Sequence, residues 1–196
     1  MSKFVRNEDA FTGLEAAIVL IAFVVVAAVF SYVVLGAGFF TTGEAQRTVH
    51  TGVGQATSNL EVSGPVIVKA TDTTNLGAIS FFLQLAAGGS PVDMKKVTFT
   101  VSTAEKLETF TYANVTKNWY VDGKKQETTS TPPQNDMLDK FEMVRITIMT
   151  KGTQTLPTIN TNDRFTVEVK PDIGAALPIN RIAPPDFQAG HNYEVY

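Results

Sequence analysis

The sequence predicts an α+β protein in which a long N-terminal hydrophobic α-helix is followed by an all-β immunoglobulin-like sandwich. Two observations predict this class. Residues 16–40 carry no charge, and Ser31 and Tyr32 hold the only polar side chains among them. Beyond residue 60, short runs of β-branched and aromatic residues alternate apolar with polar positions, as half-buried strands do. The chain therefore changes from a helical part to a β part near residue 60.

Composition excludes several classes of protein. The 196 residues carry a net charge of −3 with no basic cluster, so no nucleic acid partner is expected. Cysteine is absent, which rules out disulfides, thiolate catalysis and cysteine zinc sites. The two histidines, His50 and His191, lie far apart in the chain, and no nucleotide-binding or hydrolase motif is present. The sequence predicts a structural protein, not an enzyme, without cofactor or metal.

The uncharged run is long enough to cross a membrane. As a helix it spans about 37 Å, against roughly 30 Å for the hydrocarbon core of a bilayer. A charged stretch containing Lys3 and Arg6 precedes it, and the small residues Ala10 and Gly13 stand before the run, not after it. A secretory signal has the opposite order. The order indicates a leader that is cut in front of the hydrophobic segment; the alternative is an uncleaved signal anchor.

A family resemblance lies in the same region. Residues 10–30, AFTGLEAAIVLIAFVVVAAVF, resemble the class III signal and N-terminal segment of the type IV pilin superfamily. Within them IVLIAFVVVAAV, followed by LGAGFFTT, closely resembles archaeal flagellins (archaellins). The resemblance implies cleavage between Ala10 and Phe11 by a prepilin-peptidase-like signal peptidase. It also implies a signal peptide over residues 1–10, a filament-core helix over 11–60 and an outer β-sandwich over 61–196.

After such a cut Gly13 would be third and Glu15 fifth in the mature chain. In related pilins a Glu at this place faces the N-terminal amine of a neighbouring subunit, which here would belong to Phe11. An ionised carboxylate in an apolar bundle is costly unless it is paired. A local interpretation stays open, because Thr12 to Glu15 also reads as a capping box at a helix start.

The polar stretch 41–60 predicts a weak helix that continues the apolar one, with a kink near Gly52 and Gly54. Turn signals then separate the expected strands at residues 88–91, 122–123, 131–133 and 162–163. Four aspartates, at positions 72, 93, 122 and 163, are interpreted as turn formers in preference to cation ligands. The expected strands are 65–69, 79–85, 97–101, 110–112, 119–121, 143–149 and 165–169.

Asn114-Val-Thr116 is an N-glycosylation sequon between two expected strands, so Asn114 is a candidate glycan site. The Thr- and Pro-rich segment 127–133 is a weaker candidate for O-linked sugar.

The resemblance implies a subunit of the archaeal flagellum (archaellum) filament, which polymerises through its N-terminal helix for swimming motility. The expected partners are further copies or related archaellins in a helical filament, the signal peptidase and the archaellum motor and assembly machinery. The precursor is expected in the cytoplasmic membrane and the filament at the cell surface. Alternatives are an adhesive archaeal pilin, or a single-pass surface protein whose immunoglobulin-like domain binds a ligand.

Overall fold

The computed structural model describes residues 5–126, 135–152 and 154–196, with side chains from residue 12 onward. The chain divides into two compact units, Met1–Thr51 and Gly52–Tyr196. We call the second unit the β domain. The expected turn at 131–133 and the candidate O-glycan segment 127–133 fall outside the described residues.

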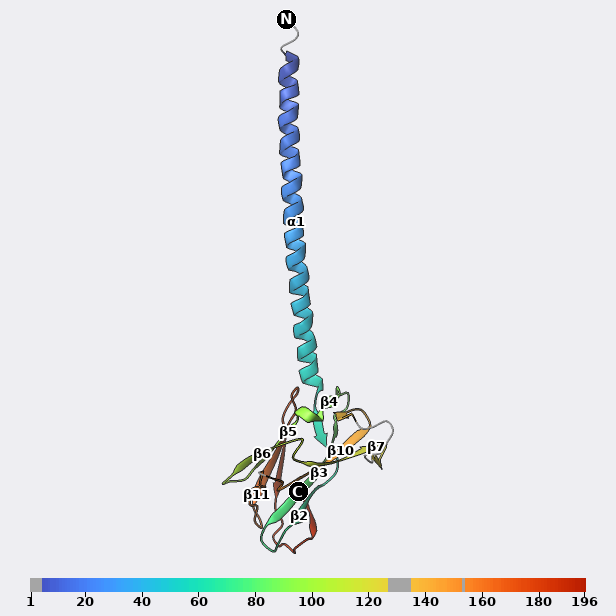
Figure 1. Ribbon diagram of the computed structural model, residues 1–196, viewed down its shortest axis with the longest axis vertical. Helices are drawn as coiled ribbons and strands as arrows, with labels where there is room; N and C mark the ends of the chain where they lie inside the picture. Colours follow the sequence, from blue (N-terminus) through green and yellow to red (C-terminus); the bar gives the residue numbers. More distant parts are fainter. Residues whose placement is uncertain (1–4, 127–134, 153) are drawn as a thin grey trace. The chain divides into compact units, whose positions relative to one another are not determined.

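A single α-helix, α1 (Val5–Thr57), occupies the N-terminal part of the chain (Figure 1). It contains no proline, so no backbone donor is missing along its length. At 1.5 Å per residue its 53 residues extend for about 80 Å. The helix is unbroken at Gly52 and Gly54, where a kink was expected. Because α1 already begins at Val5, Thr12 lies inside the helix, and the capping box starting at Thr12 is not formed in the full-length chain.

The end of α1 is bonded into the β domain. The Thr57 carbonyl accepts a hydrogen bond from the Ser90 amide at 3.2 Å, and the two hydroxyls of these residues are 2.9 Å apart. Ser58 is buried, and a Cβ on Gly174, which has φ +113°, would collide with the Ser58 carbonyl. Gly174 is therefore required by both backbone conformation and space.

In the described residues of the β domain there are thirteen strands and one short 3₁₀ helix, η1 (Met94–Lys96). In chain order the strands are β1 (Leu60–Val62), β2 (Val66–Ala70), β3 (Leu76–Leu85), β4 (Val92–Asp93), β5 (Thr98–Ser102), β6 (Leu107–Thr111), β7 (Thr116–Val121), β8 (Lys124–Lys125), β9 (Met137–Leu138), β10 (Glu142–Met149), β11 (Arg164–Lys170), β12 (Leu177–Ile182) and β13 (Asn192–Val195).

The strands form two main sheets in which every pairing is antiparallel. The larger sheet has the order β13-β2-β3-β10-β7-β8, with β1 also paired to β3. The smaller sheet has the order β12-β11-β5-β6, and β4 pairs with β9 separately. At the β7–β8 hairpin, Asp122 and Gly123 have φ of 49° and 75°, as the tight turn expected at this pair requires.

The core lies between the two main sheets. In β11, Phe165, Val167 and Val169 are buried while their neighbours are less so, because side chains alternate between the two faces of a strand. Phe81 of β3 and Phe99 of β5 belong to different sheets, and their ring centroids lie 6.4 Å apart. The largest fully buried side chains are Phe81, Phe99, Phe110, Phe165, Phe187, Ile79, Leu83, Met94, Leu138, Ile146, Ile148 and Ile159.

The predicted fold class is confirmed: a long N-terminal helix precedes antiparallel sheets that pack as a sandwich. Each of the seven expected strand regions overlaps a strand of the structure.

Candidate assembly surface

The most unusual surface of the molecule is that of α1. All described side chains between residues 12 and 53 are exposed, although most of those in residues 16–40 are apolar. By length and composition α1 could cross a membrane. The large exposed apolar side chains in its first part are Leu14, Ile18, Val19, Leu20, Ile21, Phe23, Val24, Val25, Val26, Val29, Phe30, Tyr32, Val33, Val34, Leu35, Phe39 and Phe40.

Leaving these side chains in water is unfavourable. Each large apolar side chain contributes about 1.5–3 kcal/mol when it is fully buried, so the sum over this set reaches tens of kcal/mol. Small residues lie among them. Gly36 and Gly38 have no side chain, and no other part of the subunit lies within 4 Å of the position that a Cβ would take at either residue. Small residues let helix backbones approach closely. The surface of α1 is therefore suited to contact with other helices.

The residues predicted from the sequence to take part in signal cleavage and assembly all lie near the start of α1. Ala10 and Phe11, which flank the expected cut, are helical, as are Gly13 and Glu15. Glu15 is exposed, and it is the only charged residue between positions 12 and 43. The helix therefore offers one carboxylate at the head of an otherwise uncharged surface.

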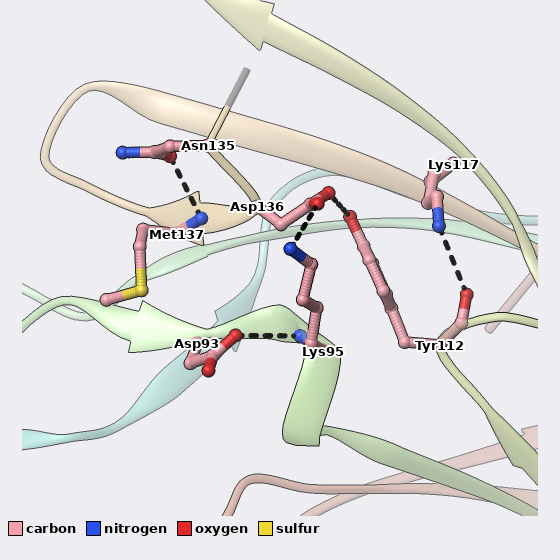
Figure 2. A network of polar contacts seen from close by, with 7 residues as sticks. All are labelled: Asp93, Lys95, Tyr112, Lys117, Asn135, Asp136 and Met137. Atoms are coloured by element: carbon pink, nitrogen blue, oxygen red, sulfur yellow. Dashed lines mark hydrogen bonds and ion pairs between the residues drawn. The ribbon is translucent and has the colours of Figure 1, made fainter. Parts of the chain in front are cut away.

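A polar network at the β domain was not anticipated from the sequence (Figure 2). Asp136 accepts a hydrogen bond from the Tyr112 hydroxyl at 2.7 Å, and its other oxygen lies 3.2 Å from Lys95 Nζ. The Asp136 carbonyl accepts from the Met94 amide at 3.0 Å. Lys117 Nζ lies 3.8 Å from the Tyr112 ring centroid. Asp136 thus joins the segment before β9 to η1 and to the β6–β7 turn.

Burial alone would raise the pKa of Asp136, but the hydrogen bonds from Tyr112 and Lys95 and the charges of Lys95 and Lys117 outweigh it. They hold the pKa below its ordinary value. Burial, with the Asp136 hydrogen bond and charge, raises the pKa of Tyr112. At neutral pH the pair is a phenol that donates to a carboxylate, which is a charge-assisted hydrogen bond.

Removing this carboxylate should destabilise the β domain. We expect Asp136→Ala to lower the free energy of unfolding by about 1–3 kcal/mol, because the buried Tyr112 hydroxyl loses its acceptor. Asp136→Asn keeps an acceptor oxygen and should cost less than half as much. The measurement is urea unfolding at pH 7, with Asp186→Ala on the exposed surface as a control that should change little.

Asp136→Asn also allows a test of the pH dependence of stability. A carboxyl whose folded pKa is depressed contributes stability that is complete above its unfolded pKa of about 3.8 and is lost as pH falls through the folded pKa. The stability difference between wild type and Asp136→Asn should therefore shrink below about pH 4. A difference that stays constant from pH 7 to pH 3 would contradict the ionised Asp136 described here.

Three of the four aspartates interpreted as turn formers lie in turns, whereas Asp93 ends strand β4. Asp72 accepts from the amides of Thr74 and Asn75, both at 2.7 Å, and these hydrogen bonds lower its pKa to about 2. Asp93 caps η1 by accepting from the Lys95 amide, and Asp163 accepts from the Asn160 amide. Asp122 occupies the β7–β8 turn. Among the described residues no group of three or more potential metal ligands is found.

The sequon lies in the turn between β6 and β7. Asn114 is half-buried, and its Nδ2 donates to Gln154 Oε1 at 2.7 Å. Gln154 Nε2 in turn donates to the Thr109 carbonyl at 2.7 Å. Val115 is buried, and Thr116 begins β7. The structure thus places Asn114 at the expected surface turn, with its side chain held by one neighbour.

A long helix with an exposed, uncharged stretch at residues 16–40, followed by a compact antiparallel β domain, is typical of the class of pilin-like filament subunits. Comparison with known proteins specifies the family. Residues 10–181 match the archaeal-type flagellin family. A probable flagellin of Archaeoglobus fulgidus is 45% identical over 196 residues, which cover 95% of this chain and 96% of the relative. The chain belongs to the archaeal-type flagellin family.

Solved structures agree with this assignment. The archaeal flagellum of Methanospirillum hungatei strain JF1 matches with a TM-score of 0.70 and 33% identity, covering 94% of this chain and 99% of that one. The crystal structure of archaeal flagellin FlaB1 from Methanocaldococcus jannaschii has a TM-score of 0.52 and 11% identity, and it covers 69% of this chain and 95% of that one. The latter likeness concerns the fold alone. The protein is a structural subunit of the extracellular archaeal flagellum filament, not an enzyme.

Proposed function

We propose that the chain is made as a membrane precursor and becomes a filament subunit by cleavage. The precursor lies in the cytoplasmic membrane through α1, with Lys3 and Arg6 on the cytoplasmic side, as the positive-inside rule favours. A prepilin-peptidase-like enzyme cuts between Ala10 and Phe11 and removes residues 1–10. The segment of residues 11–60, which is helical up to Thr57, then leaves the lipid and packs with helices of other copies, and residues 61–196 form the outer sheath.

The observation that carries this proposal is the exposed, uncharged surface of α1. Lipid tails are as apolar as a helix bundle, so transfer from lipid to bundle changes the hydrophobic free energy little. Release into water would instead cost tens of kcal/mol, which exceeds the roughly 4–15 kcal/mol entropic cost of association. A subunit therefore stays in the assembled filament once it has left the membrane.

Glu15 and Gly13 guide assembly in this proposal. Cleavage creates a cationic amine on Phe11, and the Glu15 carboxylate of a neighbouring subunit pairs with it inside the apolar core. A charge in such a core is tolerated when it is paired. Gly13 has no side chain, so it lets a neighbouring backbone approach this pair closely.

Asn114 carries an N-linked glycan on the sheath. Its turn lies at the surface of the β domain, and the side-chain amide nitrogen has two hydrogens. A sugar bound to Nδ2 leaves one hydrogen for the bond to Gln154, so the modified turn keeps its present conformation.

The filament is rotated by the archaellum motor and serves swimming. Deleting the gene should remove this class of filament from the surface, seen by electron microscopy, and abolish swimming. Complementation with the wild-type gene should restore both, whereas Ala10→Lys should leave precursor-sized chain in the membrane fraction. Mature-sized chain in the Ala10→Lys strain would overturn the assigned cut. Motile deletion cells with impaired attachment would instead indicate an adhesive pilin.

A further inference from the structure

Phe141 has an unusual combination of conformation and exposure. It lies in the turn that leads into β10, where the Glu142 amide donates to the Asp139 carbonyl at 3.3 Å. Its φ is +66°, a region that favours Gly and Asn and disfavours bulky residues. Its side chain is 85% exposed, so it gains little from packing within the subunit. A strained backbone at an exposed aromatic residue points to a function outside the subunit.

Phe141 lies on the wall of a groove in the β domain. The groove has a volume of about 530 Å³ and is lined by residues 84–88, 122 and 140–143. Leu85, Met143 and the alanines at 86 and 87 make much of this lining apolar. Phe141 therefore stands beside a partly apolar hollow that an apolar side chain of another molecule could fill.

One wall of the groove is bonded to the segment just after α1, inside the β domain. The Ala86 amide, on this wall, donates to the Asn59 carbonyl at 3.0 Å, and Asn59 lies two residues beyond the end of α1. The groove is therefore built next to the point where the chain leaves the helix.

The last part of α1 carries an apolar surface that could fill such a groove. Residues 41–57 are largely polar, yet Ala45, Val49, Val53 and Ala56 recur every three or four positions and so lie on one face of the helix. Val49 and Val53 are 63% and 55% exposed. We call these four residues the apolar stripe. A heterologous contact repeats along a filament, so two complementary surfaces on one kind of subunit can meet between different copies.

We propose that the groove beside Phe141 receives the apolar stripe of a neighbouring subunit's helix in the filament. Phe141 then packs against Val49 and Val53 of that neighbour. This contact joins the sheath of one subunit to the core helix of the next, and it rests on the filament assembly described above.

We expect Phe141→Gly to raise the thermal stability of the isolated subunit and to lower that of the filament. Glycine relieves the positive φ, so the melting temperature of the detergent-solubilised full-length subunit, followed by β-type circular dichroism, should rise by about 2–4 °C. Filaments detached from cells should instead dissociate at a lower temperature than wild type. Asn162→Gly, at φ 62° away from the groove, and Leu107→Ser, at an exposed apolar position, are matched controls that should leave the dissociation temperature unchanged.

A double-mutant cycle identifies the partner. Val49→Ser combined with Val53→Ser should lower the dissociation temperature, and adding Phe141→Gly should lower it little further, because residues in contact are not additive. Fully additive effects would overturn the contact with the stripe, and an unchanged dissociation temperature for Phe141→Gly would overturn the docking role. Failure of the wild-type chain to form filaments would instead contradict the proposed function.

Discussion

Replacing Val25 by Asp should abolish filament formation. Val25 lies in the middle of the uncharged surface of α1, where no cationic side chain is within reach along the helix. In an assembled bundle the new carboxylate would be buried without a partner, which costs several kcal/mol in each subunit. Since every subunit repeats this cost, the expected result is no filaments by electron microscopy, although the chain is still produced.

The control is Val25→Leu, which keeps the surface apolar and should give filaments of normal number and length. Insertion into the membrane should survive better than assembly, because one charged residue at a helix centre costs about 2.5–3.5 kcal/mol during insertion and the rest of the segment is strongly apolar. The membrane fraction of the Val25→Asp strain should therefore contain the chain. Abundant normal filaments in this strain would mean that α1 does not form a water-free core.

Removing residues 1–51 should convert the protein into a soluble, folded monomer. The remaining unit, Gly52–Tyr196, has its own core between two sheets. All of the largest fully buried side chains among the described residues belong to this unit, and none belongs to the removed one. The removed unit contains the uncharged stretch that requires lipid or other helices. The expected result is a β-type circular dichroism spectrum, cooperative thermal unfolding and a monomeric mass in the absence of detergent.

The core between the sheets supplies the control for this experiment. Phe81 and Phe99 pack against each other across the sandwich, so Phe81→Ala in the shortened chain should cost about 3–5 kcal/mol. The full-length chain should aggregate under the same detergent-free conditions. A shortened chain without β structure would show that the β domain depends on the helix for its fold.

The sequence predicts the parts of this fold whose signal is local. Residues 16–40 carry neither a charge nor a proline, and that is sufficient to predict the helix. Strands β5, β10 and β11 alternate apolar and polar residues, so their positions follow from the period of two. The Asp122-Gly123 turn was likewise readable, because few residue pairs adopt two positive φ angles.

Other strands could not be predicted because their partners define them. β12 contains Pro178, Asn180 and Arg181, which is a poor strand composition, yet it pairs along β11 as an edge strand, where proline is tolerated. β13 is a short strand next to the end of the chain, and β2 fixes its register. The two-residue strands β4 and β9 pair only with each other across a long separation in sequence.

The assembly surface was predictable, whereas the polar network and the Phe141 groove were not. The composition of a long apolar stretch is sufficient to predict that lipid or other helices must bury it. Tyr112, Asp136 and Lys95 meet only because the β6–β7 turn, the segment before β9 and η1 lie together in the fold, and the spacing of these residues in the sequence does not predict this. The positive φ of Phe141 depends on the turn before β10, and a phenylalanine gives no local signal for that conformation.

In the proposed filament α1 lies in a water-excluded core. The chain has no cysteine, so a single introduced cysteine reports on one place. Ala28 in α1 and Ala104 in the β domain are both exposed in the isolated subunit, which makes Ala28→Cys and Ala104→Cys a matched pair. The measurement is the rate of labelling by a water-soluble maleimide in intact detached filaments. We expect Ala104→Cys to react at least about tenfold faster than Ala28→Cys, with equal rates after denaturation; equal rates in intact filaments would contradict the claim.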